Sequence, residues 1–211
     1  IFSSSAAVYG YPKYLPIDEK HETNPINYYG FTKLVIEGII KWYSEINGFN
    51  YALLRYFNAA GYDMGGRINN KEKNTANLLP IIMEVAAGER DYLNIYGNDY
   101  ATQDGTCIRD YIHVNDLSDA HIKSLHYINS NNKNLLANLA TGKGYSVNEV
   151  LRIAESVTGA NIKHKYVDRR PGDPEELIAK TTNAYKLLGW EPSYSSIKTI
   201  IDSMWKVYSE K

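Results

Sequence analysis

Apolar residues recur with two different periods along the chain, and the alternation of these periods predicts helices and strands in turn. The clearest helix is predicted over residues 28–47, where five apolar residues recur at helical spacing. They are Leu34, Ile36, Ile39, Ile40 and Trp42. Gly48 fits the left-handed position that ends a helix, and the apolar run 51–57 is typical of a buried parallel strand.

The alternation continues to the end of the chain. Further strands are predicted over 92–96, 107–114, 135–140 and 162–167, and further helices over 76–88, 115–127, 147–158, 182–188 and 195–209. Asn115 is a candidate N-cap, and Ser146 with Glu149 forms a capping box. Pro80 is expected to kink its helix or to lie in the first turn. Residues 67–77 are expected to form an exposed loop, and the whole pattern favours an α/β fold with a parallel sheet.

Composition and charge exclude several classes of protein. The 211 residues carry 23 basic and 24 acidic side chains, and this balance argues against a nucleic-acid binder or a polybasic membrane anchor. No apolar run of about 18 residues predicts a membrane span, and no signal peptide is expected. The single cysteine, Cys107, excludes an internal disulfide and fits a reducing compartment, so a cytoplasmic location is expected. Cys107 lacks a base and His113 lacks a partner at ligand spacing, so both are interpreted as structural and no metal site is expected.

A tyrosine and a lysine four residues apart form the candidate catalytic pair. On a helix such residues share a face, and a cation beside a phenol stabilises the phenolate, which can act as a general base. The spacing occurs as Tyr9/Lys13, Tyr29/Lys33 and Tyr194/Lys198, and solvated surface residues are the simpler interpretation of most such pairs. Only Tyr29/Lys33 lies early in a predicted helix and follows three serines at a strand end, where α/β sheets bind ligands. Alone, the three serines are typical of a polar turn.

Seven segments, in order along the whole chain, carry a family resemblance. They are SSSAAVYG at 3–10, NPINYYGFTK at 24–33, RYFNAAG at 55–61, NLLP at 77–80, IYGNDY at 95–100, RDYIHV at 109–114 and RRPGD at 169–173. Together they resemble the UDP-glucose 4-epimerases of the extended short-chain dehydrogenase/reductase family. The resemblance implies the C-terminal part of a Rossmann-type parallel sheet, formed by 1–58 with a return segment at about 108–140. A smaller α/β region, 59–107 and 141–211, would bind the UDP-sugar.

The resemblance also implies a mechanism and a cofactor, NAD. Tyr29 would take the proton of the sugar 4-hydroxyl while C4 gives hydride to NAD+, and return of hydride to the other face would interconvert UDP-glucose and UDP-galactose. Lys33 would hold the nicotinamide ribose, and Ser5 would hydrogen-bond the sugar O4. The residues expected to contact the cofactor are Ser3, Ser4, Tyr29, Lys33, Tyr56 and Phe57.

The remaining expected contacts are to the nucleotide-sugar. They are Ser5, Asn58, Asn77, Leu78, Asn94, Tyr96, Arg109, Arg170 and Asp173. The two arginines would clamp the diphosphate. Without the resemblance, Arg109 with Asp110 would be interpreted as a surface ion pair, and 169–170 as a solvated turn. Leu177 aligns with a gate beside the sugar 2-substituent, where a large tyrosine excludes N-acetyl sugars, so N-acetyl substrates are a hypothesis.

Two departures from related patterns leave alternatives open. Sugar-nucleotide dehydratases carry an Asp-Glu pair where this chain has Ser5 and Ala6, which disfavours dehydration. The Gly-rich turn that holds the NAD pyrophosphate is missing, because the glycines at 61–66 lie in mid-chain. The chain is therefore interpreted as a fragment of an epimerase, or as a truncated remnant that only binds nucleotide-sugar or dimerises. A related UDP-sugar epimerase, a decarboxylase and a plain NAD-dependent dehydrogenase are further alternatives, and a homodimer through helix 28–47 is expected of the full enzyme.

Overall fold

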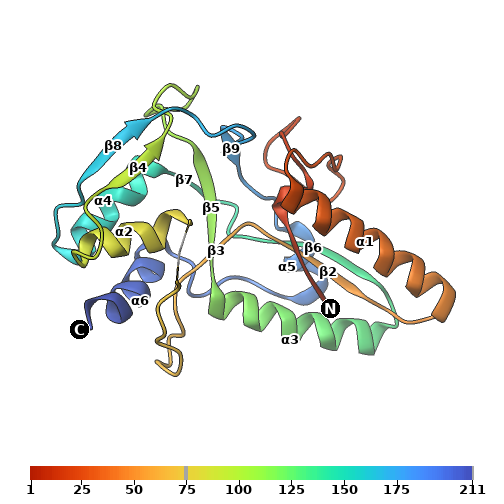
Figure 1. Cartoon of the computed structure of the whole chain (residues 1–211). Helices are drawn as coiled ribbons and strands as arrows, with labels where there is room; N and C mark the ends of the chain where they lie inside the picture. The colour runs from red at the N-terminus through yellow and green to blue at the C-terminus, as the bar shows by residue number, and fades with distance from the viewer. Residues whose placement is uncertain (74–75, 211) are drawn as a thin grey trace.

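The computed structural model describes residues 1–73 and 76–210. Its first sheet has three parallel strands in the order β1-β2-β6, formed by Phe2–Ser5, Ala52–Tyr56 and Leu135–Leu139. Helix α1, Tyr28–Asn47, lies on one face of this sheet, and α3, Val114–Asn131, and α5, Thr182–Leu188, lie on the other (Figure 1). This layered arrangement of helices around parallel strands confirms the predicted α/β class.

The register of the strands decides which side chains meet which helix. Ser4 pairs with Arg55 and Ser5 with Tyr56. Because side chains alternate along a strand, Ser4 and Arg55 point to the α1 face, whereas Tyr56 points to the α3 face. Leu54 lies on this α3 face, in a core cluster with Ile112, Leu117 and Trp190.

The rest of the chain forms a second group of strands and helices around its own core. A sheet has the order β3-β5-β7, with β9 also paired to β5, and a further sheet joins β4 to β8. These strands are Asn58–Ala60, Ile108–His113, Gly144–Ser146, Glu176–Leu177, Leu93–Tyr96 and His164–Val167. Helices α2, Leu78–Ala86, α4, Val147–Thr158, and α6, Ile197–Ser209, pack together beside them (Figure 1). Their buried side chains form one cluster, which includes Met83, Val150 and Ile200.

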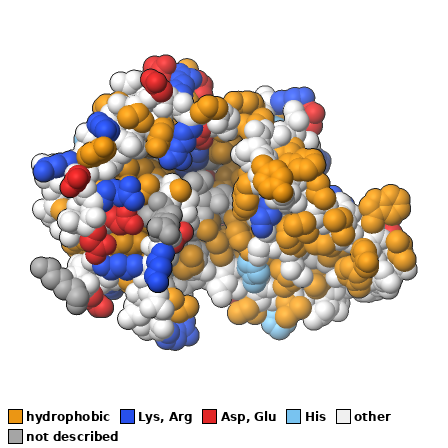
Figure 2. Space-filling model, in the orientation of Figure 1, with side chains coloured by type: hydrophobic (Ala, Val, Ile, Leu, Met, Phe, Trp, Pro, Cys, Tyr) orange, Lys and Arg blue, Asp and Glu red, His pale blue; other side chains and the backbone are white. Residues whose placement is uncertain are grey.

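The predicted helix 28–47 is confirmed over the same residues, and Gly48 ends it at a φ of 70°. The face that this helix buries is not its apolar stripe. Its buried residues are Gly30, Glu37 and Ser44. Trp42 is 67% exposed, and the apolar side chains of α1 gather on the surface, as the right side of Figure 2 shows.

Four local predictions concern a proline, a capping box, an N-cap and a loop. Pro80 lies in the first turn of α2, and the capping box of Ser146 and Glu149 is present. The predicted N-cap Asn115 is wrong, because α3 begins at Val114 and His113 caps it by accepting a hydrogen bond from the Asn115 amide. The Asn115 side chain instead accepts from the amide of Met64. In the predicted loop 67–77, residues 74–75 lie outside the described residues.

Candidate functional site

A cavity of about 690 Å³ lies where the ends of β1 and β2 meet β3 and β5. A smaller cavity of about 190 Å³ shares part of its wall, including Asn58, Arg109 and Asp173. Most of the residues expected at the site line one or both cavities: Ser4, Ser5, Tyr29, Tyr56, Phe57, Asn58, Asn77, Leu78, Asn94, Tyr96, Arg109, Arg170, Asp173 and Leu177. Residues that are far apart in the sequence therefore converge on one place.

The start of α1 brings Tyr29 to the end of strand β1. Asn27 caps the helix by accepting a hydrogen bond from the Gly30 amide at 2.8 Å. A Cβ atom at Gly30 would lie 2.3 Å from the carbonyl oxygen of Ala7, so only glycine permits this close approach. The approach places Tyr29 in the wall of the cavity that Ser5 also lines.

Lys33 lies one helical turn after Tyr29, on the same side of α1. Its Nζ is 5.5 Å from the centroid of the Tyr29 ring and donates a hydrogen bond of 2.9 Å to the carbonyl oxygen of Ser3. The other two candidate pairs differ. Tyr9 and Lys13 are not on a helix, and Tyr194 precedes α6, which begins at Ile197. Of the three pairs, only Tyr29/Lys33 therefore has the helical geometry.

The three consecutive serines end strand β1 and have three different environments. Ser3 Oγ forms a 2.6 Å hydrogen bond with the Tyr56 hydroxyl on the α3 face. Ser4 is buried and donates to Glu37 Oε1 on the α1 face at 2.5 Å. Ser5 lines the cavity, and its oxygen accepts a hydrogen bond from the Ala7 amide. Among the described hydrogen bonds, the Ser5 hydroxyl is thus the one that leaves its hydrogen available to a ligand.

A buried ion pair lies beneath Ser4. Arg55 donates from Nε and Nη2 to the two carboxylate oxygens of Glu37, at 2.9 and 2.6 Å. Burial opposes the charge of Glu37, but the hydrogen bonds from Arg55 hold the pKa of this carboxyl below its usual value. The Arg55 guanidinium also lies over the ring of Tyr9, 4.8 Å from its centroid.

Arg109 and Asp173, both expected to contact the nucleotide, also contact each other. Arg109 is 8% exposed, and its Nη2 donates to Asp173 Oδ1 and, at 2.7 Å, to the carbonyl oxygen of Pro174. The alternative of a surface pair between Arg109 and Asp110 is wrong, because Asp110 is buried and accepts hydrogen bonds from Thr141 and Gly142. Burial raises the pKa of Asp110. Arg109 thus presents a fixed guanidinium to both cavities.

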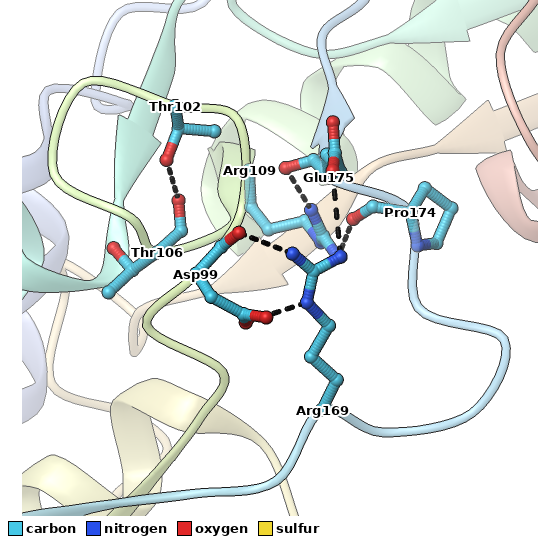
Figure 3. Close-up of polar contacts among 7 residues, drawn as sticks. All are labelled: Asp99, Thr102, Thr106, Arg109, Arg169, Pro174 and Glu175. Carbon is cyan, nitrogen blue, oxygen red and sulfur yellow. Dashed lines mark hydrogen bonds and ion pairs between the residues drawn. The ribbon is translucent and has the colours of Figure 1, made fainter.

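The neighbouring arginines 169 and 170 are exposed, but both are held by partners. Arg169 donates to the side chain and the carbonyl of Asp99, as Figure 3 shows. The guanidinium carbon of Arg170 lies 3.8 Å from the centroid of the Tyr96 ring. Beside them, the buried Oδ1 of Asn94 has no hydrogen-bond partner among the described residues. This end of the site therefore offers an aromatic ring, a cation and a free acceptor.

Several residues of the cavity wall and its surroundings were not predicted from the sequence. Tyr111 lines both cavities, and burial raises the pKa of its hydroxyl. Its place in an apolar strand gave no sign of this position. The cap Asn27 could have been found, since an asparagine just before an amphipathic segment is a helix-start signal. His121 of α3 lies behind the wall, 2.6 Å from the Tyr56 hydroxyl, and no motif indicated it.

The two residues interpreted as structural are both in the interior. His113 is fully buried, and burial lowers the pKa of its ring. Cys107 is buried, which raises the pKa of its thiol. Across residues 1–73 and 76–210, no group of three or more His, Cys, Asp or Glu side chains could hold a metal ion. In the same ranges, no helix is both long and apolar enough to span a bilayer.

Comparisons with known proteins give a consistent set of relatives. A family model described as GDP-mannose 4,6 dehydratase matches residues 1–204. The chain is 45% identical to a UDP-glucose 4-epimerase of Halalkalibacterium halodurans over 210 residues, which cover 100% of this chain and 63% of that protein. It is also 45% identical to a UDP-glucose 4-epimerase of Lacticaseibacillus casei, over 97% of this chain and 62% of that protein. The chain thus spans less than two thirds of the length of these curated relatives.

Solved structures are similar to the chain over its whole length. A UDP-glucose 4-epimerase from Brucella ovis in complex with NAD has a TM-score of 0.94 and 43% identity, covering 99% of this chain and 64% of that one. A UDP-Glc/GlcNAc 4-epimerase from Campylobacter jejuni has a TM-score of 0.81 and 38% identity, covering 100% of this chain and 64% of that one.

Proposed function

Because the chain belongs to the extended short-chain dehydrogenase/reductase family, matched through the GDP-mannose 4,6 dehydratase model, we propose that it forms the C-terminal part of a UDP-glucose 4-epimerase. In this proposal the enzyme interconverts UDP-glucose and UDP-galactose. One observation carries it. Tyr29, with the Lys33 ammonium beside its ring, lines the same pair of adjoining cavities as a set of groups suited to phosphate and a base.

The end of the site formed by Tyr29, Lys33 and Ser5 suits acid–base chemistry. The Tyr29 ring lies in the cavity wall with the Lys33 ammonium beside it, and a cation next to a phenol favours the phenolate that can accept a proton. Ser5 has a hydroxyl hydrogen to donate in the same wall. These two groups suit the removal and return of a proton at one sugar hydroxyl.

The second end of the site fits a nucleoside diphosphate. Arg109 and Arg170 provide planar guanidinium groups, which suit the oxygens of a diphosphate. Tyr96 provides an aromatic surface, and the free Oδ1 of Asn94 can accept a hydrogen bond from a base N–H. A uracil carries such an N–H, so the polar groups match UDP.

The acid and base needed to eliminate water are missing from the positions where dehydratases carry them. The residue after Ser5 is Ala6, a buried methyl group without an ionisable atom. This supports epimerisation over dehydration, although the matching family model is described as a dehydratase.

The described residues fit one part of the expected cofactor. When bound, NAD would supply a hydride acceptor for the sugar carbon. Lys33, Tyr56 and Phe57 would hold its nicotinamide end, since they lie at or beside the wall next to Tyr29. No helix among the described residues begins with a Gly-x-Gly-x-x-Gly turn, so this proposal places the pyrophosphate site outside them.

Turnover of UDP-galactose to UDP-glucose, measured in the complete protein that carries this chain, tests the proposal. Tyr29→Phe should lose most turnover and keep its affinity for UDP, because the phenolic oxygen that would accept the proton is removed and the ring stays. Tyr28→Phe, at an 81% exposed neighbour, is the matched control and should keep both. Near-wild-type turnover in Tyr29→Phe would refute the role of Tyr29.

Two measurements separate the alternatives. A plain dehydrogenase releases reduced cofactor, so the absorbance of the reduced cofactor would rise during turnover. An epimerase restores its cofactor in each cycle, so this absorbance would stay constant. A native protein with an intact mass near 23.9 kDa and UDP binding without turnover would favour the non-catalytic remnant.

The exposed apolar face of α1 supports the homodimer expected for the enzyme. Tyr43 is 59% exposed and Ile46 75% exposed, on the same helix as Trp42. Large exposed apolar patches mark interaction surfaces. We expect Trp42→Glu to shift the sedimentation coefficient from that of a dimer to that of a monomer, and an unchanged value would refute this interface.

A further inference from the structure

His121 lies on α3, on the opposite face of the sheet from α1, and none of the motifs includes it. Its Nδ1 is 2.7 Å from the carbonyl oxygen of Leu117, one turn earlier in the same helix. A carbonyl can only accept a hydrogen bond, so Nδ1 carries the hydrogen. In the neutral ring, Nε2 is therefore an acceptor with a fixed direction.

This acceptor points at the cavity wall. The Tyr56 hydroxyl lies 2.6 Å from His121 Nε2, and it also lies 2.6 Å from Ser3 Oγ. Ser3 Oγ and His121 Nε2 are themselves 3.3 Å apart, so the three polar groups close a triangle. The rings of Tyr56 and His121 meet edge to face, with centroids 5.5 Å apart.

The triangle is joined to the candidate catalytic pair through a single residue. The side chain of Ser3 belongs to the triangle, and its carbonyl oxygen accepts the hydrogen bond from Lys33 Nζ. Tyr56 itself lines the main cavity beside Tyr29. A change at His121 therefore reaches the site mainly through the Tyr56 hydroxyl, which lies 2.6 Å from both His121 Nε2 and Ser3 Oγ.

We propose that His121 is a positioning residue for the site, fixing Tyr56 and Ser3 from behind the sheet so that Lys33 is held beside Tyr29. It contacts neither cavity, so it acts only through these side chains. The inference rests on the proposed function for its consequence in turnover. The hydrogen-bonded arrangement can be tested without turnover.

Kinetics of the complete protein give the first test. His121→Leu removes the acceptor, and we expect kcat for epimerisation to fall at least about tenfold, the equivalent of about 1.4 kcal/mol, while the Kd of UDP changes less than about twofold. His121→Gln should restore much of kcat, because its amide oxygen can accept a hydrogen bond from a hydroxyl of the triangle. His126→Ala, at an exposed histidine of the same helix, is the matched control and should leave kcat unchanged.

A double-mutant cycle asks whether His121 acts through Tyr56. Tyr56→Phe should lower kcat, and adding His121→Leu to it should lower kcat less than about twofold further. A His121→Leu protein within twofold of wild-type kcat, or independent effects of the two changes, would overturn the proposal.

Nuclear magnetic resonance separates this inference from the proposed function. Wild-type His121 should show the Nδ1–H form of the ring, and the Lys33 side-chain ammonium signal should shift in His121→Leu but not in His126→Ala. If the wild-type protein lacks epimerase activity, the proposed function fails. The two magnetic resonance measurements then still test whether His121 positions Tyr56, Ser3 and Lys33. The positioning role is overturned if His121 Nδ1 carries no hydrogen, or if the Lys33 signal is the same in His121→Leu as in the wild-type protein.

Discussion

The buried pair of Glu37 and Arg55 gives the most direct test of how this fold is held together. Glu37 lies in the middle of α1 with none of its surface exposed, and it accepts hydrogen bonds from Ser4 and from two nitrogens of Arg55. Glu37→Gln keeps the shape of the side chain and removes its charge. The variant leaves the buried Arg55 guanidinium without its ion-pair partner.

The expected loss in the free energy of unfolding follows from these contacts. Removing one partner of a buried ion pair destabilises a protein by about 3–5 kcal/mol, because the other charge remains buried and unpaired. Against a typical total of about 5–15 kcal/mol, this loss is large. Ser4→Ala is a milder variant, expected to lose about 1.5–3 kcal/mol, since it removes one hydrogen bond to a charged group. Glu37→Met with Arg55→Met should recover at least half of the loss, because no charge is then buried.

Urea denaturation followed by circular dichroism at pH 7 measures these free energies of unfolding. Glu45→Gln, at an exposed position of the same helix, is the matched control and should leave the midpoint unchanged. Arg55 holds the pKa of Glu37 below the ordinary 4.5, so its stabilisation is complete above that pH and disappears as the pH falls. A loss below about 1 kcal/mol for Glu37→Gln at pH 7 would refute the reasoning.

Three further predictions concern separate parts of the chain. Burial lowers the pKa of His113, so the unfolded state binds more protons than the folded state as the pH drops below about 6.5, and the free energy of unfolding falls. In His113→Gln, the urea midpoint should therefore vary less between about pH 5 and pH 7 than in the wild-type protein. Ser146→Ala removes a capping box and a 2.5 Å hydrogen bond to Asp104, so it should lower the free energy of unfolding by about 1–2 kcal/mol, whereas an unchanged midpoint would contradict the cap. Leu177→Tyr narrows the main cavity and should lower the turnover of UDP-N-acetylglucosamine relative to UDP-glucose by at least about tenfold; an unchanged ratio would remove Leu177 as a gate.

Much of the fold was predictable because local patterns decide it. Helical spacing and the glycine at its end gave the bounds of α1, and the serine and glutamate at 146 and 149 gave the start of α4. The period of a helix shows which residues share a face. It does not show which face meets the sheet. Most of the apolar stripe of α1 lies at the surface, and the structure buries the charged Glu37 instead, because Arg55 of β2 lies opposite to pair with it.

The candidate site was predictable only as a set of residues. The motifs named Arg109 and Asp173 separately, but their pairing spans 64 residues and depends on how β5 and the segment before β9 come together. The neighbour in sequence, Asp110, suggested the wrong partner. His121 carried no signal, since its role depends on the face of α3 that meets Tyr56 across the tertiary structure.

The cage of acceptors around Arg109 has a consequence for how a ligand is received. Besides Asp173 and Pro174, its Nη1 donates to the carbonyl oxygens of Ile108, at 2.7 Å, and Glu175, at 3.4 Å. Ordering a free side chain at a binding site costs about 0.5–1.5 kcal/mol, and here folding has already met that cost. Arg109 is preorganised, so an anion that binds through its Nε–H, the donor that these four hydrogen bonds leave unused, should meet a small entropic penalty.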